Sequence, residues 1–92
     1  MDAAEKAAMA LSKMQTEAGD VFKNYLAFTK TISAFGPIDH KTQEMILIAC
    51  ALMSQCEQCI SIHVQNGAAA GLSREEILQS AMLAISMGGS PR

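Results

Sequence analysis

The sequence predicts an all-α protein, a compact bundle of about five helices that assembles into an oligomer. Apolar residues recur three to four positions apart along the chain, and no stretch alternates between apolar and polar residues as a half-buried strand does. The 92-residue chain is 50% hydrophobic and only 17% charged, whereas globular domains average about 25% charged residues. Because so short a chain has little interior, we expect part of its apolar surface to be buried against other copies.

The composition disfavours several classes of protein. The formal net charge is −2 and no Lys/Arg cluster occurs, which argues against a nucleic-acid partner. The most apolar run, Met45 to Met53, has nine residues, and a membrane span needs about 20. The N-terminus lacks the basic start and apolar stretch of a signal peptide. Three cysteines are too few for a secreted disulfide framework. We therefore expect a cytoplasmic protein with no membrane segment.

Two helices are predicted for the N-terminal part of the chain. A first helix is indicated by apolar residues at helical spacing, namely Ala7, Leu11, Met14 and Ala18. This helix is expected to end near Gly19. Asp20 is expected to cap a second helix, which ends at Gly36-Pro37 because proline cannot continue the hydrogen-bond ladder. We expect one domain over residues 1–92, with residues 1–37 as an N-terminal helical arm and residues 38–92 as the core.

The third predicted helix is the most apolar segment. Asp39 has the character of an N-cap, and the helix runs through Met53. After Glu44 every position is apolar, so we expect this helix to be the most buried element, covered on all sides. Cys50 in its middle is expected to be a packing residue.

Turn signals delimit two further helices. A break near Ser54-Gln55 precedes a fourth helix, from about Glu57 to Ala70, and Gly71 fits the left-handed position after a helix end. Ser73 and Glu76 have the spacing of a capping box for a fifth helix. Its expected buried face comprises Ile77, Leu78, Ala81, Met82 and Ile85. The final Gly88-Gly89-Ser90-Pro91 is expected to be a tail or a linker.

The residues with catalytic potential gather in the fourth helix. At 100° per residue, Cys56, Cys59 and His63 fall within about 60° of arc on one face. Backbone N–H groups at a helix N-terminus and a nearby imidazole both favour a thiolate. A histidine that acts as a base is usually oriented by a carboxylate, and Glu44, at the head of the apolar run on the preceding helix, is the candidate.

Three interpretations of this pattern remain open from the residues alone. The first is a redox-active dithiol assisted by His63 and Glu44. The second is a structural zinc site with Cys56, Cys59 and His63, which needs a fourth ligand such as Cys50 or His40. The third is a set of packing cysteines beside an ordinary polar histidine.

The spacing of Glu44, Cys56, Cys59 and His63 resembles the active-site motif of the AhpD-like alkylhydroperoxidases, which belong to the carboxymuconolactone decarboxylase superfamily. The segments Ile38–Ile46 and Gly71–Ile77 are also similar to the flanks of that motif. The resemblance covers roughly residues 38–89, over half of the chain.

The resemblance implies an all-helical trimer or hexamer that reduces hydroperoxides without a cofactor or a metal. Cys59 would be the peroxidatic thiol, Cys56 the resolving thiol, His63 the base and Glu44 its orienting carboxylate. A dithiol, carried on a lipoylated protein in some members, would reduce the resulting disulfide.

One position departs from the family pattern. Gln58 stands where some peroxidase members carry a histidine, and an amide cannot act as a base. Two alternative functions are therefore considered. One is a carboxymuconolactone decarboxylase-type lyase that uses Glu44 and His63 and needs no cysteine pair. The other is a structural, zinc-binding or oligomeric protein without catalysis.

Overall fold

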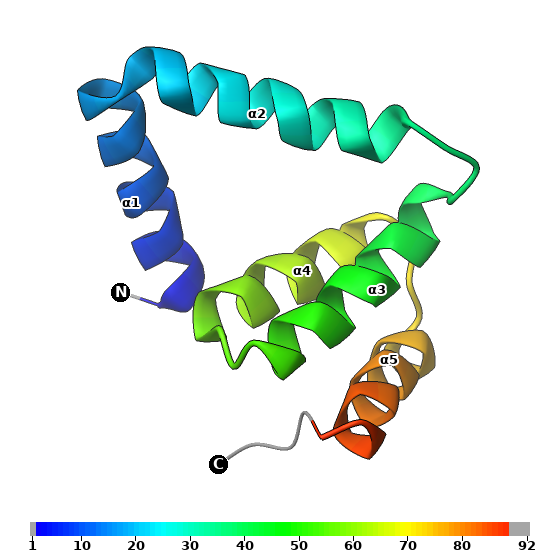
Figure 1. Cartoon of the computed structure of the whole chain (residues 1–92). Coiled ribbons are helices and arrows are strands. Elements are labelled where there is room, and N and C mark those ends of the chain that lie inside the picture. The colour runs from blue at the N-terminus through cyan, green and yellow to red at the C-terminus, as the bar shows by residue number, and fades with distance from the viewer. Residues whose placement is uncertain (1, 89–92) are drawn as a thin grey trace. The chain divides into compact units, whose positions relative to one another are not determined.

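The computed structural model describes residues 2–88, and within this range it contains five α-helices and no strand (Figure 1). The helices are α1 (Ala3–Glu17), α2 (Gly19–Ala34), α3 (His40–Met53), α4 (Glu57–Ala69) and α5 (Arg74–Ser86). The predicted all-α fold class is confirmed. None of the described helices is long and apolar enough to cross a membrane. The predicted tail beyond Gly88 lies outside the described residues.

The chain divides into two compact units between Pro37 and Ile38. The first unit holds α1 and α2, which contact each other. The Asp2 carboxylate caps α1 by accepting a hydrogen bond from the Glu5 amide at 2.7 Å. The predicted Asp20 cap is wrong. Helix α2 already begins at Gly19, with Ala18 as an N-cap that offers no side-chain acceptor, and Asp20 lies inside the first turn.

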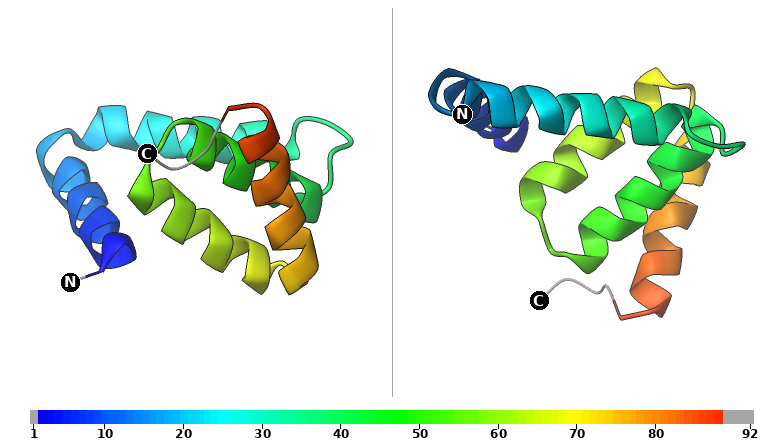
Figure 2. Two further views of the ribbon diagram at one scale, coloured as in Figure 1. Left: turned by 90° about the horizontal axis from the view of Figure 1, so that it is seen from below. Right: turned by 45° about the horizontal axis from the view of Figure 1, so that its top comes forward.

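The second unit is built around α3, which packs against both α4 and α5. Figures 1 and 2 show α3 flanked by α4 on one side and by α5 on the other. As predicted, Asp39 caps α3, because its carboxylate accepts a hydrogen bond from the Thr42 amide at 3.2 Å.

Within one chain α3 is not covered on all sides, so the full cover expected for it includes neighbours from other copies, which stays a prediction. Its buried residues, Glu44, Ile48 and Ala51, lie four and three positions apart and form one stripe. Two helices cannot enclose a third, so apolar side chains remain exposed elsewhere on α3, namely Ile46, Leu47 and Met53. Cys50 is also an exposed free cysteine in this chain.

The end of α4 packs closely against the residues that follow it. The amides of Gly71 and Leu72 donate to the carbonyls of Ala68 and Gly67, and Gly71 has the predicted left-handed conformation with φ of 98°. This pair of bonds closes a helix end. A Cβ at Gly67 would lie 2.7 Å from Leu72 Cδ1. The small residue is therefore used for packing within the chain.

Helix α5 begins with the predicted capping box. The Ser73 hydroxyl accepts from the Glu76 amide at 3.0 Å, and the Glu76 carboxylate accepts from the Ser73 amide at 2.8 Å. The predicted buried face is correct only in part: Ile77 and Ala81 are half-buried, but the buried residues are Ser80 and Ala84. Small side chains allow α5 to approach α3 closely, and the larger side chains of Leu78, Met82 and Ile85 stay exposed.

Candidate active site

Cys56 belongs to two helix ends at once. Its amide donates to the Ala51 carbonyl at 3.2 Å, and the Gln55 amide donates to the Leu52 carbonyl at 3.1 Å. These bonds close the C-terminus of α3 in the same pattern as at the end of α4. Gln55 has φ of 55° and is the only non-glycine residue described with a positive φ. Cys56 itself is the N-cap of α4, so the turn places its side chain at the start of that helix.

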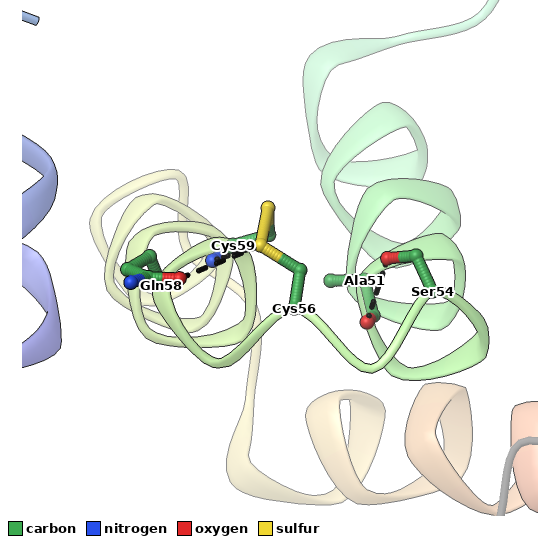
Figure 3. The surroundings of a disulfide bond; sticks show 5 residues. All are labelled: Ala51, Ser54, Cys56, Gln58 and Cys59. Atoms are coloured by element: carbon green, nitrogen blue, oxygen red, sulfur yellow. Dashed lines mark hydrogen bonds between the residues drawn. A yellow bond between two sulfur atoms is a disulfide. The ribbon is translucent and has the colours of Figure 1, made fainter.

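A disulfide joins Cys56 to Cys59, with the two Cα atoms 5.2 Å apart (Figure 3). The Cys59 amide donates a hydrogen bond to Cys56 Sγ at 3.2 Å, so a sulfur atom here fills the role that an oxygen usually fills in an N-cap. The Gln58 side-chain oxygen lies 3.9 Å from the same sulfur. Figure 3 shows Cys56 between the first turn of α4 and the Ala51–Ser54 end of α3.

A buried carboxylate and a half-buried imidazole face each other across α3 and α4. His63 Nδ1 lies 3.0 Å from Glu44 Oε2, and the two side chains are 26% and 6% exposed. An ionised carboxylate can only accept, so Nδ1–H is the donor. This bond holds the ring so that Nε2 is free of Glu44 and can exchange a proton with another group. No buried side-chain nitrogen or oxygen among the described residues lacks a hydrogen-bond partner.

The structure brings the four predicted residues into two linked pairs. One pair is the disulfide Cys56–Cys59 and the other is Glu44–His63. Cys59 and His63 lie one helical turn apart on the same side of α4, which connects the pairs. All four residues lie in the second unit, on α3, on α4 and at the N-cap between them.

The zinc hypothesis requires several cysteine and histidine side chains around one ion. Within the described residues, no three His, Cys, Asp or Glu side chains are arranged to hold a metal ion. The candidate fourth ligands, Cys50 and His40, therefore do not complete a set with Cys56, Cys59 and His63.

Two features near the site were not predicted from the sequence. The left-handed conformation of Gln55 was missed because glycine or asparagine usually occupies that position. The second feature is an open apolar hollow of about 520 Å³ between α3 and α5, where Cys50, Met53, Leu83 and Met87 are among the lining residues. Its only sequence signal was the excess of apolar residues.

Comparisons with known proteins agree with this fold. The model of the carboxymuconolactone decarboxylase family matches residues 19–92. The chain is 30% identical over 82 residues to uncharacterized protein 4 in the cox locus of Paracoccus denitrificans. The aligned residues make up 89% of this chain and 74% of that protein. It is also similar to the crystal structure of an apo carboxymuconolactone decarboxylase family protein from Legionella pneumophila. That match has a TM-score of 0.88 and 29% identity, and covers 97% of this chain and 80% of the other.

Proposed function

The chain belongs to the carboxymuconolactone decarboxylase family, and from this premise we propose that it is an AhpD-like thiol peroxidase that reduces hydroperoxides. One observation carries the proposal: the Cys56–Cys59 disulfide lies at the start of α4, the helix whose His63 is hydrogen-bonded to Glu44 on α3. A nucleophile, a base and a second thiol are thus available together.

In the oxidative half of the reaction, His63 takes the proton of the Cys59 thiol. The Cys59 thiolate attacks one oxygen of the hydroperoxide, and the O–O bond breaks. The leaving alkoxide takes up the proton and departs as an alcohol, while Cys59 becomes a sulfenic acid. Cys56 then attacks the Cys59 sulfur, water leaves and the disulfide forms. Glu44 orients His63 and stabilises its protonated form.

The cycle closes when an external dithiol reduces the disulfide. Two electrons pass from the dithiol, which becomes a disulfide itself, and the Cys56 and Cys59 thiols are regenerated. A lipoylated protein has the required chemistry.

Single-cysteine variants test the proposal. Cys59→Ser should reduce the consumption of an alkyl hydroperoxide to the background rate. Cys56→Ser should leave a sulfenic acid on Cys59 that dimedone traps in a mass spectrum. Cys50→Ser is the matched control and should keep full activity. A Cys59→Ser variant as active as the wild type would show that the nucleophile is assigned wrongly.

A lyase of the decarboxylase type is the second candidate, and the buried Glu44–His63 pair favours it. This pair can move a proton at a substrate carbon without a thiol. The discriminating measurement is the turnover of a cyclic lactone acid by the Cys56→Ser/Cys59→Ser double variant. Turnover that survives in this variant and is lost in His63→Gln would replace the peroxidase proposal.

A further inference from the structure

The two sulfur atoms of the disulfide have unequal surroundings. Cys56 Sγ accepts a hydrogen bond from the Cys59 amide at 3.2 Å and occupies the N-cap of α4. The backbone of Cys56 is held separately by its amide bond to the Ala51 carbonyl. This anchor does not involve the disulfide, so it can hold the Cys56 backbone at the helix N-terminus, within reach of the Cys59 amide, after the S–S bond is broken.

This position stabilises a negative charge on Cys56 Sγ. The first-turn amides and the positive end of the helix dipole both favour an anion there. Three neighbouring groups act in the opposite direction. His63, one helical turn from Cys59 on α4, favours a thiolate on Cys59 when its ring carries the proton. The Glu57 carboxylate in the first turn is exposed, so solvent and salt screen its charge. The Gln58 carbonyl oxygen lies at 3.9 Å, farther from the sulfur than the amide nitrogen of Cys59.

We propose that Cys56 is the leaving sulfur when the disulfide is reduced, and that the reductant therefore attacks Cys59. The inference rests on the proposed function and specifies its reductive half. In thiol–disulfide exchange, the sulfur that is more stable as a thiolate leaves faster. The proposal requires the N-cap hydrogen bond to stabilise a thiolate on Cys56 more than His63 stabilises one on Cys59, and the labelling experiment below measures this difference.

The exchange proceeds in two balanced steps. A thiolate of the reductant attacks Cys59 Sγ, the Cys56–Cys59 bond breaks, and its electron pair leaves on Cys56 Sγ. The reductant is now joined to Cys59 by a mixed disulfide. The second thiol of the reductant loses a proton to solvent and attacks the first reductant sulfur. Cys59 departs as a thiolate and is protonated, and the dithiol leaves as a disulfide.

This order of events favours one class of reductant. The Cys56 thiolate stays within reach of the mixed disulfide on Cys59 and can reverse the first step. A second thiol in the same reductant molecule competes with that reversal, because intramolecular attack has a high effective concentration. A vicinal dithiol is therefore a better reductant than a monothiol of equal potential.

Mapping of the mixed disulfide tests the proposal. The experiment uses the Cys50→Ser protein, which lacks the exposed third thiol. The oxidised protein is treated with 2-mercaptoethanol, quenched in acid and mapped by peptide mass spectrometry. We expect adducts on Cys59 to exceed adducts on Cys56 by roughly tenfold. Equal amounts, or an excess on Cys56, would overturn the proposal.

A mixed disulfide can move from one cysteine to the other before the acid stops the reaction, so a second measurement avoids mixed disulfides. Reduced Cys50→Ser protein is labelled at neutral pH with less than one equivalent of iodoacetamide, which reacts with thiolates. Cys56 should be labelled first, and preferential labelling of Cys59 would contradict the proposal. The preference should disappear in concentrated urea, and its persistence there would refute the structural origin. Neither measurement uses a peroxide, so loss of the peroxidase proposal would leave both results interpretable.

Discussion

At the scale of single residues, Glu44 shows how burial constrains a functional group. A carboxylate that is removed from water must find a donor, and His63 on the neighbouring helix provides it at 3.0 Å. The same bond selects the ring tautomer and leaves Nε2 available. Stability and proposed chemistry therefore depend on one interaction.

Glu44→Gln separates these two roles. The amide keeps the shape and a hydrogen bond to His63 but lacks the charge that stabilises a protonated ring. We expect hydroperoxide turnover to fall about 10–100-fold, while the thermal midpoint changes little. The measurement pairs a peroxide assay with thermal unfolding.

Glu75→Gln is the matched control for Glu44→Gln. Glu75 is an exposed carboxylate in the first turn of α5, and its loss should leave turnover unchanged. Full activity in Glu44→Gln would remove Glu44 from the proposed mechanism.

At the scale of elements, the connections between helices position the site. Cys56 is both the residue that closes α3 and the residue that caps α4, so the two helices and the disulfide share one turn. Gln55 allows this connection by adopting a positive φ, a conformation that costs about 1 kcal/mol in a residue with a Cβ.

Gln55→Gly should therefore stabilise the protein. Glycine adopts this conformation without steric cost, and we expect the free energy of unfolding to rise by about 0.5–1 kcal/mol. Urea unfolding followed by circular dichroism is the measurement. Gln79→Gly, at an exposed position inside α5, is the control and should lose about 1 kcal/mol. A loss of stability in both variants would contradict the interpretation of the turn.

Two helix caps predict how the free energy of unfolding falls at acid pH. Hydrogen bonds from the Thr42 side chain and amide lower the pKa of Asp39 below its ordinary 3.8. The Ser73 amide, with Lys41 nearby, lowers the pKa of Glu76 below 4.5. A lowered pKa in the folded state means that the stabilisation is complete above these ordinary values. It is lost as the pH falls through the folded-state values.

The Asp39→Asn/Glu76→Gln double variant tests this dependence. Asparagine and glutamine keep the capping hydrogen bonds but do not titrate in this range. The free energy of unfolding of the variant should fall less than that of the wild type between pH 5 and the acid limit of folding, measured by urea unfolding. Parallel curves for the two proteins would show that these caps do not contribute to acid sensitivity.

At the scale of the whole molecule, the described chain exposes many large apolar side chains. On α2 they include Val21, Phe28 and Phe35, and on α5 they include Met82 and Leu83, each more than half exposed. Exposed apolar surface of this extent is typical of proteins that bind other chains. We propose that copies of this chain associate, as a trimer or a hexamer, and bury part of it.

Met82→Glu tests self-association. Met82 is 60% exposed, so the charge should cost little in a monomer. In an oligomer that buries this side chain, loss of about 1.5–3 kcal/mol should weaken association at least tenfold. Sedimentation velocity over a range of concentrations is the measurement, with Gln79→Glu as the control on the same helix. A wild type that sediments as a monomer at every concentration would exclude the proposal.

The sequence by itself determined the features that depend on local chemistry. The helices follow from 3.6-residue periodicity, and the caps at Asp39 and Ser73 follow from side chains that accept hydrogen bonds from amides two or three positions on. The one-turn separation of Cys59 and His63 on α4 needed only the 3.6-residue periodicity, whereas Cys56 lies outside the helix, as its N-cap with extended backbone. Asp20 failed because an N-cap preference cannot by itself choose between adjacent starting positions.

Only the tertiary structure decided the features that depend on which surfaces meet. The apolar stripe of α5 was predicted to be buried, but the buried residues are the small Ser80 and Ala84, on the helix that packs against α3. Within the second unit, α4 and α5 both pack against α3 and leave part of its apolar surface exposed. Periodicity records how apolar a face is. It does not record which neighbour covers that face, and this depends on contacts between residues far apart in the sequence.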